Sequence, residues 1–77
     1  MQNDVQAETA IMKSCQILGE MNIPLNHFTV ATKSVEFLLE DKNCYNKLER
    51  INNQIALMIK DKKIVFTNNL PEHWELV

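Results

Sequence analysis

Four polar residues lie close together in the sequence and have the chemistry to contact nucleic acid. Lys47, Arg50, Asn53 and Gln54 recur at spacings of three, three and one, which gathers them toward one side of a helix. Arg can bond a guanine edge through two hydrogen bonds, Asn or Gln can do the same for adenine, and Lys can neutralise a phosphate. The same residue types are also ordinary on a solvated helix surface, so both interpretations stay open.

Basic residues continue beyond this group. Residues 47–63 carry five basic and two acidic side chains, a local net charge of +3. Lys60, Lys62 and Lys63 are therefore expected to contact phosphates beside the helix. Lysines at a helix C-terminus also complement the helix dipole, which is the structural alternative for these three.

The composition is that of an ordinary folded domain. The chain has 77 residues, of which 45% are hydrophobic and 23% charged, with a single Gly. This length allows one domain, residues 1–77, with a thin core. Residues 1–4 contain no core residue after Met1 and are expected to be a disordered fringe. The net charge of -2 is uneven, because residues 1–41 carry -4 and residues 42–77 carry +2.

A helix over residues 46–61 is expected to position the polar group. Its apolar residues keep a helical period, and Asn46 is a suitable N-cap. The core side of this helix is predicted to contain Leu48, Ile51, Ile55 and Met58.

Residues 5–21 predict a first helix, ended by Gly19 and Pro24. Its apolar stripe is broader than one packing partner requires, so this helix is expected to form a dimer or partner interface. The alternative is that the same side chains fill the core. The predicted interface residues are Ile11, Met12, Cys15, Leu18 and Met21.

A second helix is expected over residues 29–41, with Thr29 or Thr32 as its cap. Ile23, ahead of Pro24, favours extended backbone, and a short strand is possible there. The apolar side of the second helix is predicted to contain Phe28, Val35, Leu38 and Leu39.

Residues 64–77 predict a β-hairpin. Ile64 to Thr67 is β-branched and aromatic, and the last five residues alternate around Trp74 and Leu76. Because an isolated hairpin is marginal in water, Trp74 and Leu76 are expected to pack on the helices. The fold class is therefore mainly α with a C-terminal β-hairpin, three helices plus a two-stranded wing.

This order of elements resembles the winged helix-turn-helix superfamily. The resemblance covers nearly the whole chain and is strongest from Leu48 through Lys63 to the hairpin. It implies that the third helix enters the major groove and that the wing lies along adjacent DNA backbone, as in a DNA-binding transcription regulator. A cytoplasmic setting is expected separately, because Cys15 and Cys44 have no paired spacing and the first residues do not resemble a secretory signal. A homodimer is expected through the first helix. The predicted hairpin tip, residues 68–72, departs from the pattern because it contains no Lys or Arg.

Two other functions remain open. One is a protein-interaction module of the same fold that does not bind DNA, such as an adaptor or a phage or plasmid accessory factor. The other is a helical bundle that exchanges its C-terminal strand between subunits. An enzyme is not expected, because one Gly and the absence of a Ser/His/Asp or Cys/His set leave no catalytic motif. No metal or cofactor is expected, nor a membrane span, because apolar runs are short.

Overall fold

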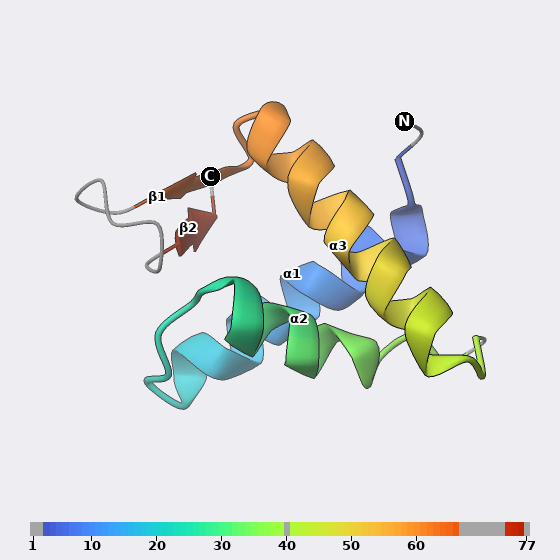
Figure 1. The fold of residues 1–77 in the computed structure, drawn as a ribbon. Coiled ribbons are helices and arrows are strands. Elements are labelled where there is room, and N and C mark those ends of the chain that lie inside the picture. The colour runs from blue at the N-terminus through green and yellow to red at the C-terminus, as the bar shows by residue number, and fades with distance from the viewer. Residues whose placement is uncertain (1–2, 40, 67–73, 77) are drawn as a thin grey trace.

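A computed structural model describes residues 3–39, 41–66 and 74–76. Three helices are followed by a two-stranded antiparallel sheet, which confirms the predicted fold class (Figure 1). The elements are α1 (Val5–Glu20), α2 (His27–Val35), α3 (Cys44–Lys60), β1 (Ile64–Phe66) and β2 (Trp74–Leu76).

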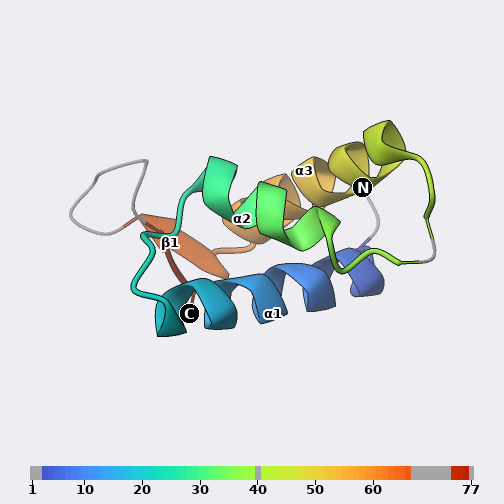
Figure 2. The same ribbon diagram turned by 90° about the horizontal axis from the view of Figure 1, so that it is seen from below.

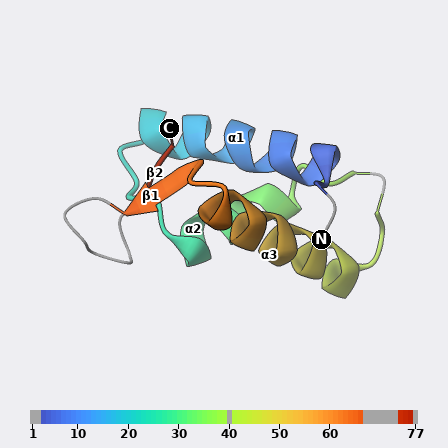
Figure 3. The same cartoon turned by 90° about the horizontal axis from the view of Figure 1, so that it is seen from above.

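The three helices all pack on one another, and the small sheet closes one end of the molecule. Figures 2 and 3 show α1 and α3 beginning at the same end and finishing beside the hairpin. The first turn of α1 therefore lies next to the first half of α3. The shared core between these elements is formed by Ala7, Ala10, Ile11, Cys15, Leu18, Val30, Ala31, Leu38, Ile51, Ile55, Met58, Ile64 and Trp74.

Helix α1 has a defined cap at each end. The Asp4 side chain accepts a hydrogen bond from the Ala7 N–H at 3.1 Å, so Asp4 is the N-cap rather than part of a disordered fringe. At the other end Asn22 takes a left-handed conformation with φ of 59°. The Ile23 N–H then donates to the Leu18 carbonyl at 2.9 Å, which ends the helix where the sequence predicted.

Helix α2 is shorter than predicted and starts earlier. Asn26 is its N-cap, and Thr29 is the third helical residue: the Thr29 N–H donates to Asn26 Oδ1 and the Asn26 N–H donates to Thr29 Oγ1. The predicted caps at Thr29 and Thr32 are therefore wrong. Because the helix ends at Val35, Leu39 lies beyond it and is 78% exposed, contrary to the prediction.

Helix α3 begins at Cys44, with Asn43 rather than Asn46 as its N-cap. The prediction of its core side is confirmed for Ile51, Ile55 and Met58, which are all buried, and is wrong for Leu48, which is 43% exposed. Leu48 is one turn from the start of the helix, at the rim of the packed region.

The hairpin packs on the helices as predicted. Ile64 pairs with Leu76 and Phe66 with Trp74, and both Ile64 and Trp74 are buried. The Trp74 N–H donates to the Leu25 carbonyl at 2.8 Å, which ties β2 to the α1–α2 connector. That connector makes this bond without forming the short strand that was considered there. The predicted tip of the hairpin lies outside the described residues.

Candidate nucleic-acid interface

Helix α3 has one side in the core and an opposite side that is exposed along its whole length. The exposed residues follow one another at spacings of three and four, as one face of a helix requires. This outer face consists of Asn46, Glu49, Asn53, Ala56 and Lys60. Only Asn53 and Lys60 of these were among the residues predicted to contact DNA.

Gln54 was predicted on the DNA-reading face and is instead buried, with 2% of its surface exposed. Its Oε1 accepts a hydrogen bond from the Asp4 N–H at 2.9 Å, and its Nε2 donates to Asn3 Oδ1 at 2.6 Å. Gln54 stands three residues after Ile51 and beside Ile55, so the helical period turns it toward α1. Gln54 therefore forms hydrogen bonds with the residues that precede α1. The prediction that Gln54 faces outward is wrong.

Arg50 lies on the flank of α3 between its core side and its outer face. Its Nε donates to Asp4 Oδ2 at 2.8 Å, and its Nη2 donates to Asp4 Oδ1 at 3.0 Å and to Gln6 Oε1 at 2.9 Å. Asp41 is a second acidic neighbour at 3.8 Å. The hydrogen bonds from Arg50 lower the pKa of the Asp4 carboxyl, against the smaller effect of burial. Arg50 therefore already holds an anionic group.

The predicted phosphate-binding lysines are in different environments. Lys60 and Lys62 are exposed and make no ion pair with any described residue. Lys63 donates to Glu8 Oε2 at 3.1 Å, and Lys47 is half-buried near the start of α3. Acidic side chains of α1 and its N-cap therefore pair with Arg50 and Lys63, but with neither Lys60 nor Lys62, among the described residues.

The outer face nevertheless carries groups that can read base edges. Asn can bond adenine through two hydrogen bonds, Glu can accept from the cytosine amino group, and Ala can contact the thymine methyl group. Asn46, Glu49 and Ala56 were missed by the sequence prediction. The signal was present, because these residues lie opposite the apolar stripe of α3 in the helical period.

The predicted dimer interface on α1 is wrong for three of its five residues. Ile11, Cys15 and Leu18 are at most 5% exposed, because they pack in the chain's own core. Met12 and Met21 are 46% and 59% exposed, but nine residues separate them and they point to opposite sides of α1. They therefore cannot share one interface.

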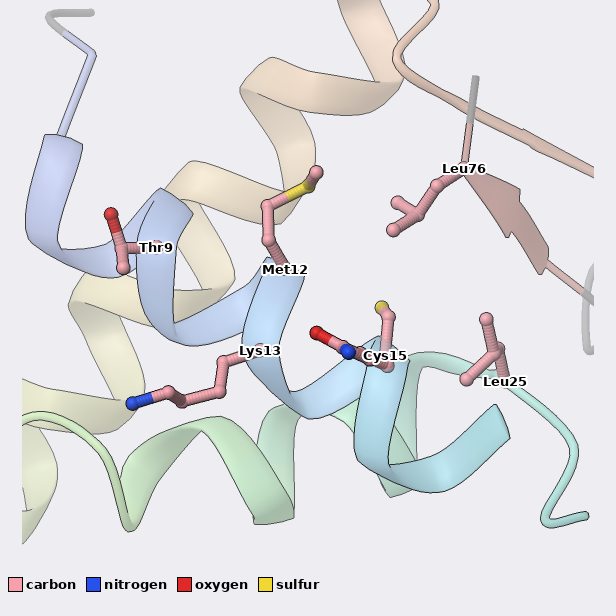
Figure 4. Close-up of a pocket in the computed structure, with 7 residues that line it drawn as sticks. Thr9, Met12, Lys13, Cys15, Leu25 and Leu76 are labelled. Carbon is pink, nitrogen blue, oxygen red and sulfur yellow. The ribbon is translucent and has the colours of Figure 1, made fainter. Parts of the chain in front are cut away.

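Met12 lies at an apolar groove between α1 and β2, with a volume of about 480 Å³. Figure 4 shows Met12 and Cys15 of α1 facing Leu76 of β2, with Leu25 beside them. Burial raises the pKa of the Cys15 thiol to about 11. Cys15 is thus almost entirely protonated at neutral pH, which makes it a poor nucleophile.

Met21 borders a second apolar groove, between α1 and α2, with a volume of about 260 Å³. Phe28 stands beside it with 77% of its surface exposed, over the partly buried Ile23. An exposed Phe next to an exposed Met departs from the burial that is usual for these residue types.

Neither a family model, a curated protein nor a solved structure matches this chain. The resemblance to winged helices therefore rests on the order of the elements. One feature departs from the helix-turn-helix pattern: residues 36–43 separate α2 from α3, whereas the usual turn has roughly three or four residues. Among the described residues, no helix is long and apolar enough to cross a membrane.

Proposed function

We propose that the protein is a small DNA-binding transcription regulator of winged-helix type, which inserts the outer face of α3 into the major groove. The observation that carries the proposal is the seven-residue spacing of Asn46, Asn53 and Lys60, all exposed on one line along the helix. Residues seven apart lie two turns apart on the same side. No described residue forms a hydrogen bond or ion pair with these three side chains.

Each group has a role that its chemistry allows. Asn46 and Asn53 contact adenine edges, and Glu49 accepts a hydrogen bond from a cytosine amino group. Lys60 and Lys62 contact phosphates, because both are exposed at the end of α3. The order of three helices followed by a hairpin supports this assignment, since the third helix is the reading helix in winged-helix proteins, which share that order.

The proposal includes a homodimer in the cytoplasm. At the end of α3, Lys60 and Lys62 are exposed and pair with no described acid, whereas Lys63 pairs with Glu8, so two copies on a two-fold symmetric site would double the available phosphate contacts. The buried residues of α1 are not available for this contact, and Met12 and Met21 are exposed on opposite sides, so at most one of them can lie in it. Both cysteines are free thiols, as a reducing compartment favours.

The test is binding to DNA by variants of the outer face. We expect Asn46→Ala with Asn53→Ala to weaken binding to a selected duplex by at least about tenfold, because a bidentate contact to a base discriminates by roughly 1–3 kcal/mol. The control is Gln16→Ala, which removes an exposed amide from α1. Affinity unchanged in the double variant, measured by fluorescence anisotropy, would contradict the proposal.

A second candidate function is docking on a partner protein, and the α1–α2 groove is the observation that favours it. Phe28 and Met21 are 77% and 59% exposed, and large exposed apolar groups are typical of interaction sites. Phe28→Ala with Met21→Ala would then abolish capture of a partner and leave DNA binding at the wild-type level. If the double alanine variant of Asn46 and Asn53 also leaves capture intact, docking and DNA binding use separate surfaces.

A further inference from the structure

The first turns of α1 place two carboxylates against the flank of α3. Figures 1 and 3 show the start of α1 beside α3. The Asp4 carboxylate binds the Arg50 guanidinium through both oxygens, and Glu8 Oε2 accepts from Lys63 Nζ at 3.1 Å. We name these two residues, Asp4 and Glu8, the acidic cover.

The acidic cover occupies basic groups in the way that a phosphate would. An Arg guanidinium binds carboxylate and phosphate with the same two-pronged geometry. Lys63 binds a carboxylate oxygen as it would a phosphate oxygen. Thus Arg50 and Lys63, two of the basic residues that the sequence predicted to contact DNA, already hold anions supplied by the chain itself.

We propose that Asp4 and Glu8 are an internal competitor of the DNA backbone, which restrains the affinity of the protein by holding Arg50 and Lys63. The inference rests on the proposed DNA-binding function and adds regulation of the same site. When DNA binds, phosphates replace the two carboxylates on Arg50 and Lys63, and the Asp4 and Glu8 side chains turn away while the Asp4 N–H stays bonded to Gln54.

The exchange is physically accessible because both ion pairs are partly solvated. The side chains of Arg50 and Asp4 are 27% and 28% exposed, and those of Lys63 and Glu8 are 51% and 28% exposed. Ion pairs at such positions contribute little net free energy, since water and salt screen them. A duplex adds the favourable release of counterions, which a single carboxylate cannot supply.

Neutral variants of the same shape test the competition. Asp4→Asn keeps a good N-cap for α1 and removes the carboxylate charge that is hydrogen-bonded to Arg50, while Asp41 stays at 3.8 Å. Glu8→Gln does the same for Lys63. The matched control is Glu20→Gln, which makes an equal change in net charge on α1 at an exposed acid that pairs with no described base. Circular dichroism checks that each variant keeps its helices.

The measurement is the Kd for a fluorescent pool of random-sequence duplexes over a series of salt concentrations. We expect Asp4→Asn and Glu8→Gln each to bind roughly 2- to 5-fold more tightly than Glu20→Gln, as loss of a partly exposed ion pair predicts. In the variant that combines Asp4→Asn with Glu8→Gln, the slope of log K against log salt becomes steeper by about 0.9 for each additional phosphate that Arg50 or Lys63 contacts.

The possible outcomes separate this inference from the proposed function. If the wild type binds DNA and the cover variants behave like Glu20→Gln, the competition is refuted and DNA binding stands. If only the cover variants bind, both are supported. If no variant binds any duplex at low salt, the proposed function fails and the competition fails with it.

Discussion

The Asp4 carboxylate accepts two hydrogen bonds from Arg50, at 2.8 and 3.0 Å, between residues 46 positions apart in the chain. The same carboxylate caps α1 by accepting from the Ala7 N–H. The Asp4 side chain therefore caps the start of α1 and joins α1 to α3. It also binds Arg50, a residue that the sequence predicted to contact DNA. Under the proposed DNA-binding function, the stability of the fold and the affinity for DNA would be coupled through this contact.

Asp4 gives the protein a predictable loss of stability in acid. Its pKa is lowered in the folded state, so its contribution is fully present above the usual value of 3.8 and is lost as the pH falls through the folded pKa. We expect the free energy of unfolding of the wild type to exceed that of Asp4→Asn by about 0.2–1 kcal/mol at neutral pH. This difference should shrink below about pH 4. Urea denaturation of both proteins at several pH values measures it. A difference that grows in acid would contradict this account.

Neighbouring amides on α3 are expected to behave in opposite ways. Gln54→Ala removes the partner of the buried Asp4 N–H and should cost about 1–3 kcal/mol of unfolding free energy. Asn53→Ala changes an exposed side chain, so stability should stay within about 0.5 kcal/mol while DNA binding weakens. Denaturation measures the stability of both variants. Fluorescence anisotropy, under conditions in which both variants are folded, measures their affinity for DNA. Equal effects on stability would be inconsistent with the burial of Gln54.

Lys62 offers a change that separates stability from affinity. Its φ of 62° is left-handed, a conformation that glycine adopts without strain. Lys62→Gly should therefore stabilise the protein by about 1 kcal/mol and yet weaken DNA binding, because a phosphate contact is lost. Lys42→Gln is the control, since it removes an exposed lysine that precedes α3 and has no proposed phosphate contact. Tighter DNA binding by Lys62→Gly would count against the proposed role of this lysine.

The two thiols should differ strongly in reactivity. Cys44 is exposed, whereas Cys15 is buried with a pKa of about 11. The raised pKa alone lowers the thiolate fraction of Cys15 by about 100-fold relative to an ordinary thiol near pKa 9. With a disulfide reagent at neutral pH, one thiol should react rapidly in the native protein and two in denaturant. The Cys44→Ser variant identifies which one; rapid native reaction of Cys15 would show that α1 is not packed as described.

The sequence was sufficient for the fold class and for most of the core. Ile51, Ile55 and Met58 keep the helical period through α3, and Trp74 is buried against the helices as its alternation predicted. The local sequence pattern does not predict where a helix begins when that position depends on an N-capping side chain. Asn26 and Asn43 start α2 and α3 through side-chain hydrogen bonds, although Thr and Asn residues further along were equally plausible caps.

The candidate site was only partly predictable, for a physical reason. The helical period places Gln54 within one residue of the core stripe, and a polar residue at that border faces water unless another element supplies a partner. Here Asp4 supplies it, from the opposite end of the sequence. The ion pair of Arg50 with Asp4 is equally non-local, so it could not be found from the spacing of residues within α3.

The salt dependence of duplex binding tests the central proposal most directly. For a wild-type dimer on random-sequence duplexes, two to four phosphate contacts per chain predict a slope of log K against log salt between about -3.6 and -7.2. Lys60→Gln with Lys62→Gln, present in both chains, should make that slope shallower by about 3.6. No binding at low salt, or a slope near zero that this double variant leaves unchanged, would contradict the proposal that α3 binds DNA.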